Sequence, residues 1–148
     1  MAEINLHCGI DEPAEEWVTN RLICWNEEAS AQVRARRQQP NDPEAFHIFA
    51  READGDLIGG VTGKVWVTWH WLQIDVMWVE PMHRKQGLGR RLLGAAEEEG
   101  RNRGCKHVRL NTGSYQAPGF YEGLGYRSYG VLEDFPPGET VYMMRKDL

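Results

Sequence analysis

The sequence predicts an α/β fold with a mixed, mainly antiparallel central sheet flanked by helices. Segments with strand patterns lie on both sides of one strongly helical segment, and two pairs of them are separated by turn residues typical of hairpins. The expected order is β-α-α-β-β-β-α-β-α-β-β. The 148 residues have the length of one domain and contain no repeat or linker, so we expect a single domain over residues 1–148.

The N-terminal third is expected to be mostly helical. Glu3 to Cys8 alternates apolar and polar residues and predicts a short strand. Pro13 favours the start of a helix that runs towards Asn26. A second helical stretch extends from about Glu27 to Gln39, where the cluster Pro40-Asn41-Asp42-Pro43 breaks it.

The middle of the chain contains the clearest patterns. Ala45 to Glu52 and Leu57 to Trp69 are expected strands, joined by the turn signal Ala53-Asp54-Gly55-Asp56. Trp71 to Val79 follows as the next strand. Gly87 to Arg103 is the strongest helix, because its apolar residues recur on one face and Gly104 suits its C-terminal end.

The last third predicts a further strand, a short helix and a hairpin. His107 to Asn111 has the strand pattern, and Pro118 to Leu124 is a short helix that begins with proline and ends before Gly125. Tyr126 to Leu132 and Thr140 to Arg145 can pair around Pro136-Pro137-Gly138.

Composition and charge exclude several classes of protein. The chain has 17 lysine and arginine residues against 22 aspartate and glutamate residues, a net charge of −5 at pH 7. This balance argues against nucleic acid and anionic membranes as partners. No signal peptide or membrane span is expected, and the three cysteines lack the spacing of metal ligands, so we expect a cytoplasmic protein without a metal.

A glycine-containing loop between a strand and a helix is the sharpest local feature. Gly87 and Gly89 stand at the expected start of the helix, and four cations but no acid occur between His83 and Arg91. Helix N-termini expose N–H groups and attract anions, so this loop predicts a phosphate site. The loop lacks both Gly-x-Gly-x-x-Gly and a terminal Gly-Lys-Ser/Thr, which argues against dinucleotide-binding and P-loop proteins.

The loop and a second motif resemble one known family. Arg84-Lys85-Gln86-Gly87-Leu88-Gly89 is similar to the Arg/Gln-x-x-Gly-x-Gly/Ala signature of the GNAT superfamily of N-acetyltransferases, and Ala117 to Tyr126 is similar to its Ala-x-x-Phe-Tyr-x-x-x-Gly-Phe element. The resemblance covers roughly Leu57 to the C-terminus. It implies a GNAT-like fold and transfer of an acetyl group from acetyl-CoA to an amine, without a metal.

The resemblance also implies where acetyl-CoA binds. The loop amides would hold the pyrophosphate, and the end of the preceding strand would bind the pantetheine arm and thioester. Asn111, Ser114 and Phe120 would contribute further contacts, with Ser114 standing where the family often has asparagine. The expected cofactor-binding residues are Met77, Trp78, Val79, Arg84, Lys85, Gln86, Gly87, Leu88, Gly89, Arg90, Asn111, Ser114 and Phe120.

Two residues are expected to move protons. An ammonium group must lose a proton before it can attack, and the leaving thiolate must gain one. Tyr121 matches the family's tyrosine beside the sulfur and is the expected general acid. Gln73 stands where the family's glutamate base occurs and cannot titrate. Strand alternation puts Gln73, Asp75 and Met77 on one face, so Asp75 is the expected base, although a structural hydrogen bond would also explain it.

The acceptor is less well defined by the sequence. Trp71 shares the face of Asp75 and could line the acceptor pocket together with Gln73, and Trp25 lies in the helical region where the family builds that pocket. An aromatic, acid-lined pocket would suit a cationic amine. We expect a small-molecule acceptor. A peptide or protein acceptor, a non-catalytic CoA-binding sensor and a homodimer stay open.

Overall fold

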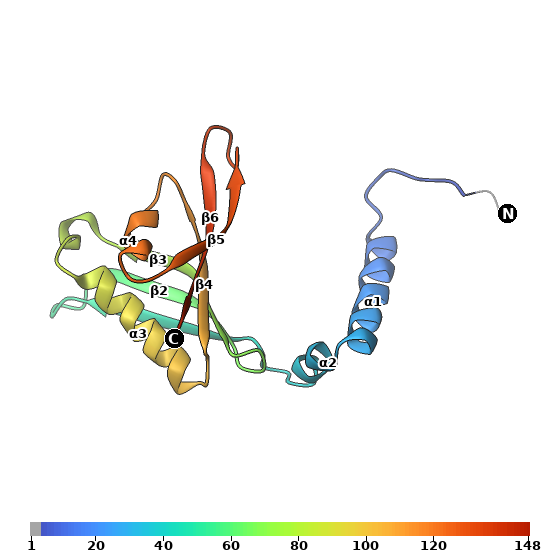
Figure 1. Ribbon diagram of the computed structural model, residues 1–148, viewed down its shortest axis with the longest axis horizontal. Helices are drawn as coiled ribbons and strands as arrows, with labels where there is room; N and C mark the ends of the chain where they lie inside the picture. Colours follow the sequence, from blue (N-terminus) through green and yellow to red (C-terminus); the bar gives the residue numbers. More distant parts are fainter. Residues whose placement is uncertain (1–3) are drawn as a thin grey trace. The chain divides into compact units, whose positions relative to one another are not determined.

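The computed structural model describes residues 4–148, which divide between Gln39 and Pro40 into two compact units (Figure 1). The first unit contains α1 (Glu12–Ala29) and α2 (Ala31–Arg37). The Asp11 carboxylate caps α1 by accepting from the Ala14 N–H at 3.0 Å, and the Ser30 hydroxyl accepts from the Val33 N–H at 3.3 Å and caps α2. The break between the helices therefore falls at Ser30 rather than near Asn26.

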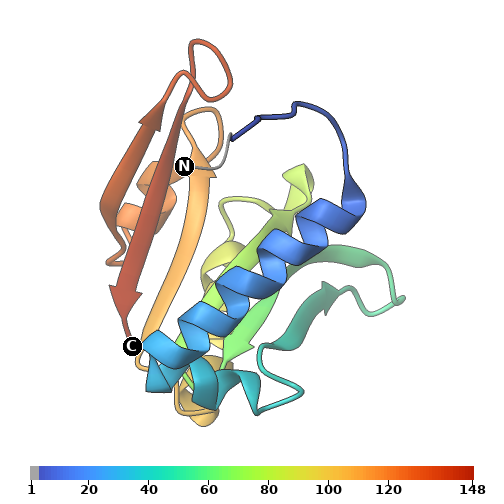
Figure 2. The same ribbon diagram turned by 90° about the vertical axis from the view of Figure 1, so that its right-hand side faces the viewer.

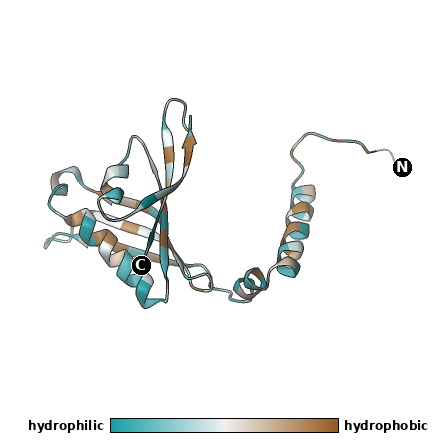
Figure 3. Ribbon diagram, viewed as in Figure 1, coloured by the Kyte–Doolittle hydropathy of each residue, from teal (hydrophilic) through white to brown (hydrophobic). Residues whose placement is uncertain are grey.

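The strand expected from Glu3 to Cys8 is not formed in the described residues. Residues 4–8 are irregular, and Glu3 lies outside the described range. Alternation alone does not make a strand, because the backbone groups of a strand need a neighbouring strand as partner. Hydrophilic and hydrophobic residues are mixed along α1 (Figure 3), and Trp17, Leu22 and Trp25 lie exposed.

The second unit is built on one six-stranded sheet. Its strand order is β1-β2-β3-β4-β6-β5, and every neighbouring pair is antiparallel except β3 and β4. The mixed, mainly antiparallel sheet predicted from the sequence is confirmed. The strands are β1 (Glu44–Arg51), β2 (Leu57–Trp66), β3 (Trp71–Val79), β4 (His107–Gly113), β5 (Arg127–Glu133) and β6 (Thr140–Asp147).

Two helices contribute to the core on the sheet. α3 (Leu88–Asn102) buries Leu92, Leu93 and Ala96, and α4 (Pro118–Glu122) packs Phe120 and Tyr121 against the same cluster. The sheet contributes the fully buried side chains of Val61, Val65, Leu72, Val108 and Met144. The residues that alternate with these in β2 and β4, such as Lys64 and Arg109, are more exposed.

A buried ionic group ties α3 to the C-terminal strand. The carboxylate of Glu97 accepts bonds from Lys146 Nζ at 2.9 and 3.0 Å and from the Tyr126 hydroxyl at 3.0 Å. Burial, followed by the neighbouring Glu97 charge, raises the pKa of Tyr126 well above its usual range, so this phenol acts only as a donor. Sequence patterning placed Tyr126 in a strand, but it precedes β5 and fixes the turn after α4 instead.

The turn between β2 and β3 shortens the strand expected to reach Trp69. β2 ends at Trp66, and the Asp42 carboxylate accepts from the N–H groups of Val67 and Thr68, both at 3.0 Å. Because this side chain takes the donors that would continue the ladder, the chain turns here. The turn closes at His70, whose φ is 60°.

Strands β3 and β4 diverge after a short paired stretch. Their partners are Trp71 with His107, Leu72 with Val108 and Gln73 with Arg109. Beyond these pairs the half of the sheet with β4, β6 and β5 separates from the half with β1, β2 and β3 (Figure 2). The facing backbone groups of β3 and β4 therefore lack each other as partners beyond Gln73 and Arg109.

A β-bulge at Asp75 changes the expected alternation of side chains in β3. Ile74 pairs with Gly63 and Val76 with Thr62, so Asp75 is an extra residue without a partner. A Cβ at Gly63 would overlap the carbonyl oxygen of Gln73, which explains the glycine beside the bulge.

The prediction that Met77 shares a face with Gln73 and Asp75 is therefore wrong. An extra residue reverses the facing of every side chain that follows it. Met77 and Val79 pack against the core, whereas Val76 and Trp78 are 61% and 53% exposed.

Candidate active site

The fork between β3 and β4, the N-terminus of α3 and the short helix α4 bring the predicted site residues together. β3 contributes Asp75 and Met77, the loop through η1 (Pro81–His83) leads to α3, and α4 contributes Phe120 and Tyr121. All of these elements belong to the second unit.

The N-terminus of α3 has the features of an anion site. Gly87 is the N-cap residue with φ +82° and makes no side-chain capping bond. The first N–H groups of a helix have no partner inside it, so those of Leu88, Gly89 and Arg90 are directed to the helix end. Lys85 also has positive φ, at 61°, and the loop from Arg84 to Gly87 is exposed. This end can accept an anion such as a pyrophosphate.

Arg84 and Gln86 are engaged within the loop. Arg84 Nε donates to the carbonyl oxygen of Val79 at 2.8 Å, and its guanidinium lies 4.5 Å from the centre of the Trp78 ring. Gln86 Nε2 donates to the carbonyl oxygen of Met82 at 3.0 Å. Arg84 therefore holds the loop against the end of β3, and Gln86 holds the loop to η1.

Gly89 joins three elements at close range. A Cβ at this position would lie 3.3 Å from Cζ of Phe120 and 3.5 Å from Cε of Met77. Leu88 packs against the core beside it. The second glycine of the motif thus permits contact between α3, α4 and β3, whereas Gly87 is required for its positive φ.

Tyr121 reaches the open side of β3 from α4. Its hydroxyl contacts Sδ of Met77 at 4.0 Å, and its ring meets those of Phe120 and Tyr126 edge to face. Burial raises the pKa of Tyr121 above its usual value, so the phenol keeps its proton at neutral pH. It is therefore suited to give up a proton to a strong base that forms beside it.

On the face of the sheet opposite to Tyr121, Asp75 is hydrogen-bonded to Gln73. Gln73 Nε2 donates to Oδ1 of Asp75 at 2.6 Å. Gln73 Oε1 accepts from Arg109 Nη2 at 2.6 Å and from Trp66 Nε1 at 3.3 Å. Asp75 and Gln73 thus lie together as expected, and Gln73 orients the carboxylate instead of titrating.

Three predicted residues lie elsewhere or have internal partners. Asn111 is exposed on β4, two residues beyond Arg109. The Ser114 hydroxyl donates to Glu139 and accepts from the Thr140 N–H at 3.0 Å, so it holds the β6 side of the loop. Trp25 belongs to the first unit and is 68% exposed there.

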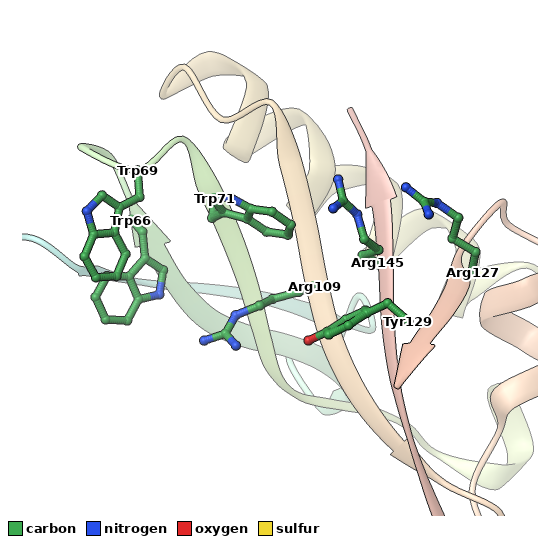
Figure 4. Close-up of a pocket in the computed structure, with 7 residues that line it drawn as sticks. All are labelled: Trp66, Trp69, Trp71, Arg109, Arg127, Tyr129 and Arg145. Atoms are coloured by element: carbon green, nitrogen blue, oxygen red, sulfur yellow. The ribbon is translucent and has the colours of Figure 1, made fainter. Parts of the chain in front are cut away.

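A pocket on the face of Gln73 was only partly predicted. Its volume is about 430 Å³, and it holds the expected Trp71 (Figure 4). Its other residues were missed, because they come from four separate strands and turns. In β4, the alternation of Arg109 with the apolar Val108 and Leu110 was a signal that could have placed Arg109 on this face. The arginine pocket, as we call it, is lined by Trp66, Trp69, Trp71, Arg109, Arg127, Tyr129 and Arg145.

The charge of the arginine pocket differs from the acid-lined pocket expected from the sequence. Three guanidinium groups line it, and the one carboxylate bound to any of them in the described chain is Asp147, 2.7 Å from Arg145. Hydrogen bonds from Arg145 and His107 lower the pKa of Asp147, which keeps this carboxylate ionised. The pocket is also aromatic: Trp66 and Trp69 stack with centroids 5.0 Å apart.

Residues 4–148 contain neither a group of metal-ligating side chains nor a membrane-spanning helix. In this part of the chain no three His, Cys, Asp or Glu side chains are grouped so that they could hold a metal ion. Among the same residues, none of the helices has the length and apolar character needed to cross a membrane.

Comparison with known proteins identifies the family. The model of the acetyltransferase (GNAT) family matches residues 10–126, and the chain belongs to this family of acetyl-transferring enzymes. It is 38% identical to blasticidin-S acetyltransferase of Streptomyces morookaense over 133 residues, covering 86% of this chain and 96% of the relative.

Solved structures agree with the assignment. An acetyltransferase from Bacillus cereus ATCC 14579 superposes with a TM-score of 0.77 at 30% identity, over 98% of both chains. Nourseothricin acetyltransferase superposes with a TM-score of 0.63 at 32% identity, over 73% of this chain and 68% of that one. The resemblance seen in the two sequence motifs is confirmed.

Proposed function

We propose that this chain transfers the acetyl group of acetyl-CoA directly to the amine of a small-molecule acceptor. The observation that carries the proposal is the fork between β3 and β4, which has the uncapped N-terminus of α3 at one side, Tyr121 on one face and Asp75 on the other. The small-molecule acceptor is supported by the names of two relatives, blasticidin-S acetyltransferase and nourseothricin acetyltransferase.

Acetyl-CoA would supply an activated acetyl thioester. The amides and cations of the loop and first turn, Arg84 to Arg90, would hold its pyrophosphate by charge and hydrogen bonds. The extended pantetheine arm would bind to the unpaired edge of β3 beyond Gln73, in the same way that an added strand pairs with the edge of a sheet. A backbone N–H at Met77 or Trp78 would then stabilise negative charge on the carbonyl oxygen.

The acceptor amine must lose a proton as its nitrogen forms the new bond to carbon. Asp75 is the proposed base, and its carboxylate is held by the Gln73 amide at 2.6 Å. The bulge leaves Asp75 without a strand partner and exposed at the fork. The proton passes to Asp75 directly or through one water molecule.

The carbon–sulfur bond breaks as the carbon–nitrogen bond forms, and the departing thiolate needs a proton. Tyr121 is the proposed donor, because burial keeps its phenol protonated and its hydroxyl lies beside Met77 on the edge of the fork. The proposed mechanism has no covalent intermediate between the acetyl group and the enzyme. Cys105, the buried cysteine, follows the C-terminal end of α3, where the helix dipole disfavours a thiolate.

The test is release of CoA thiol from acetyl-CoA in the presence of single acceptors. The panel contains blasticidin S, nourseothricin, polyamines, amino acids and a lysine-containing peptide. Acceptor-dependent thiol release with a small molecule, together with an acetylated product of the expected mass, supports the proposal. Binding of acetyl-CoA without transfer to any acceptor would contradict it, and transfer to the peptide alone would replace the small-molecule acceptor by a peptide.

A further inference from the structure

The arginine pocket contains an arrangement of like charges that the proposed chemistry does not explain. In the sheet register Arg109 of β4 pairs with Arg145 of β6, and Arg145 pairs with Arg127 of β5. The three residues therefore stand side by side on three neighbouring strands and line one cavity (Figure 4). Like charges directly opposite each other in a sheet are destabilising, so the row lowers stability unless an anion binds to it.

The protein itself supplies little compensation. Asp147 binds Arg145, and Arg109 donates to the neutral amide of Gln73. No carboxylate of residues 4–148 lies within ion-pair distance of Arg109 or Arg127. In the same described range, Nε of Arg145 is buried and has no hydrogen-bond acceptor. The row keeps donors available for an oxyanion from outside the chain.

The walls of the pocket favour a flat ring. Trp66 and Trp69 stack with an interplanar angle of 6°, and Trp71 lies under the guanidinium of Arg145 at 4.9 Å. Tyr129 is the extra residue of a bulge in β5, between the pairs of Ser128 and Gly130, which turns its side chain into the pocket. In Figure 4 its hydroxyl points towards Arg109.

The pocket is joined to the proposed base by hydrogen bonds. Arg109 donates to Gln73, and Gln73 donates to Asp75, each at 2.6 Å. These bonds engage the two ends of the Gln73 amide, so Arg109 Nη2 and Asp75 Oδ1 are separated by one amide group and two hydrogen bonds. A ligand that binds the arginine row can therefore present an amine near Asp75 only if its amine and its anionic group are separated by a comparable distance.

We infer that the arginine pocket is the acceptor site of the proposed acetyl transfer and selects an amine that also carries a ring and an oxyanion, a carboxylate or a phosphate. This inference rests on the proposed function. The guanidinium row binds the oxyanion through charge-assisted bonds, and the indoles pack on the ring. The amine is then the group left to face Asp75.

The experiment compares probes that differ in charge alone. 4-(Aminomethyl)benzoate and 4-(aminomethyl)benzamide share the ring and amine, and 4-(aminomethyl)phenylphosphonate tests the phosphate alternative. Binding is measured without acetyl-CoA by quenching of tryptophan fluorescence. We expect one of the two anionic probes to bind about tenfold or more tightly than the amide. Equal affinities of all three probes, or no binding of either anion, would overturn the inference.

A matched pair of variants assigns the preference to the pocket. Arg127→Gln removes one charge of the row without touching Gln73 or Asp75, and we expect it to reduce the preference for the anion severalfold, with rescue by Arg127→Lys. Arg51→Gln, at the end of β1 before the turn into β2, makes the same change and should leave the preference intact. An unchanged preference in Arg127→Gln would contradict the inference.

Acetyl transfer to the same probes separates this inference from the proposed function. Tight binding of an anionic probe without transfer of any acetyl group would count against the proposed function and leave the oxyanion site standing. Transfer at equal kcat/KM to 4-(aminomethyl)benzoate and 4-(aminomethyl)benzamide would support the proposed function and overturn the oxyanion site.

Discussion

Gln73 Nε2 donates a 2.6 Å hydrogen bond to Oδ1 of Asp75, although the two residues are separated by only one position in β3. In a regular strand, side chains that are two residues apart lie on the same face. Here the bulge at Asp75 brings its carboxylate into contact with the Gln73 amide. The pair places a side chain that can take up a proton next to one that cannot. The following predictions test this site and its support.

Asp75→Asn should reduce kcat/KM for the acceptor by about 100-fold or more, the usual contribution of a general base. The affinity for acetyl-CoA should stay within about twofold, because the substitution leaves the N-terminus of α3 unchanged. Steady-state kinetics and calorimetric titration measure the two effects. Asp56→Asn, in the turn before β2, is the matched control, and full activity of Asp75→Asn would remove the base assignment.

Tyr121→Phe should lower kcat about 100-fold with little effect on acetyl-CoA binding. Because burial raises the pKa of Tyr121 above 10.0, the phenol keeps its proton as the pH rises through neutrality. The wild-type rate should therefore not fall through loss of this proton below about pH 10. A pH–rate profile checks the sign, and Tyr142→Phe on β6 serves as the control. An alkaline decline near pH 8 that disappears in Tyr121→Phe would contradict the prediction.

Three of the four glycines of α3 and its N-cap should respond differently to alanine. Gly87→Ala forces a side chain into φ +82° and should cost about 1–2 kcal/mol of stability and weaken acetyl-CoA binding. Gly89→Ala brings a Cβ to 3.3 Å from Phe120 and should weaken binding by displacing α4. Gly94→Ala meets open space and should stabilise the helix by about 0.5–1 kcal/mol. Urea unfolding and cofactor titration of all three measure this order, and equal effects at the three positions would refute it.

Glu97→Ala should destabilise the second unit by about 3 kcal/mol, because it leaves Lys146 half-buried without its partner and the Tyr126 hydroxyl without an acceptor. Glu98→Ala, one residue further, removes an exposed pair with Arg101 and should change stability by less than about 0.5 kcal/mol. Chemical unfolding compares the two. A loss below about 1 kcal/mol for Glu97→Ala would show that the buried group is not a major support.

Periodicity was sufficient to predict most of the second unit. The apolar spacing of Leu88, Leu92 and Ala96 identified α3, and the turn signal at Asp54-Gly55 identified the β1–β2 hairpin. Both features depend on neighbours in the sequence. The motif residues at Gly87 and Tyr121 could be assigned for the same reason, since each motif is local and fixed in spacing.

Features that depend on pairing were not predictable. Nothing in the residues around Asp75 distinguishes a bulge from a regular strand, because the bulge is defined by the partners Thr62 and Gly63 on β2. The arginine row likewise depends on the register between Arg109, Arg145 and Arg127, which is set by packing of the whole sheet. Tertiary pairing therefore decided the details of the site that local patterns left open.

The bulge also has a consequence for how this enzyme can vary. Asp75 does not pack in the core and has no partner on the neighbouring strand. Ile74 before it and Met77 after it both pack in the core. Exchange of this one side chain should therefore change reactivity while leaving the folded state nearly as stable as before. In β3, the residue whose exchange can change the chemistry is therefore different from the residues that keep the protein folded.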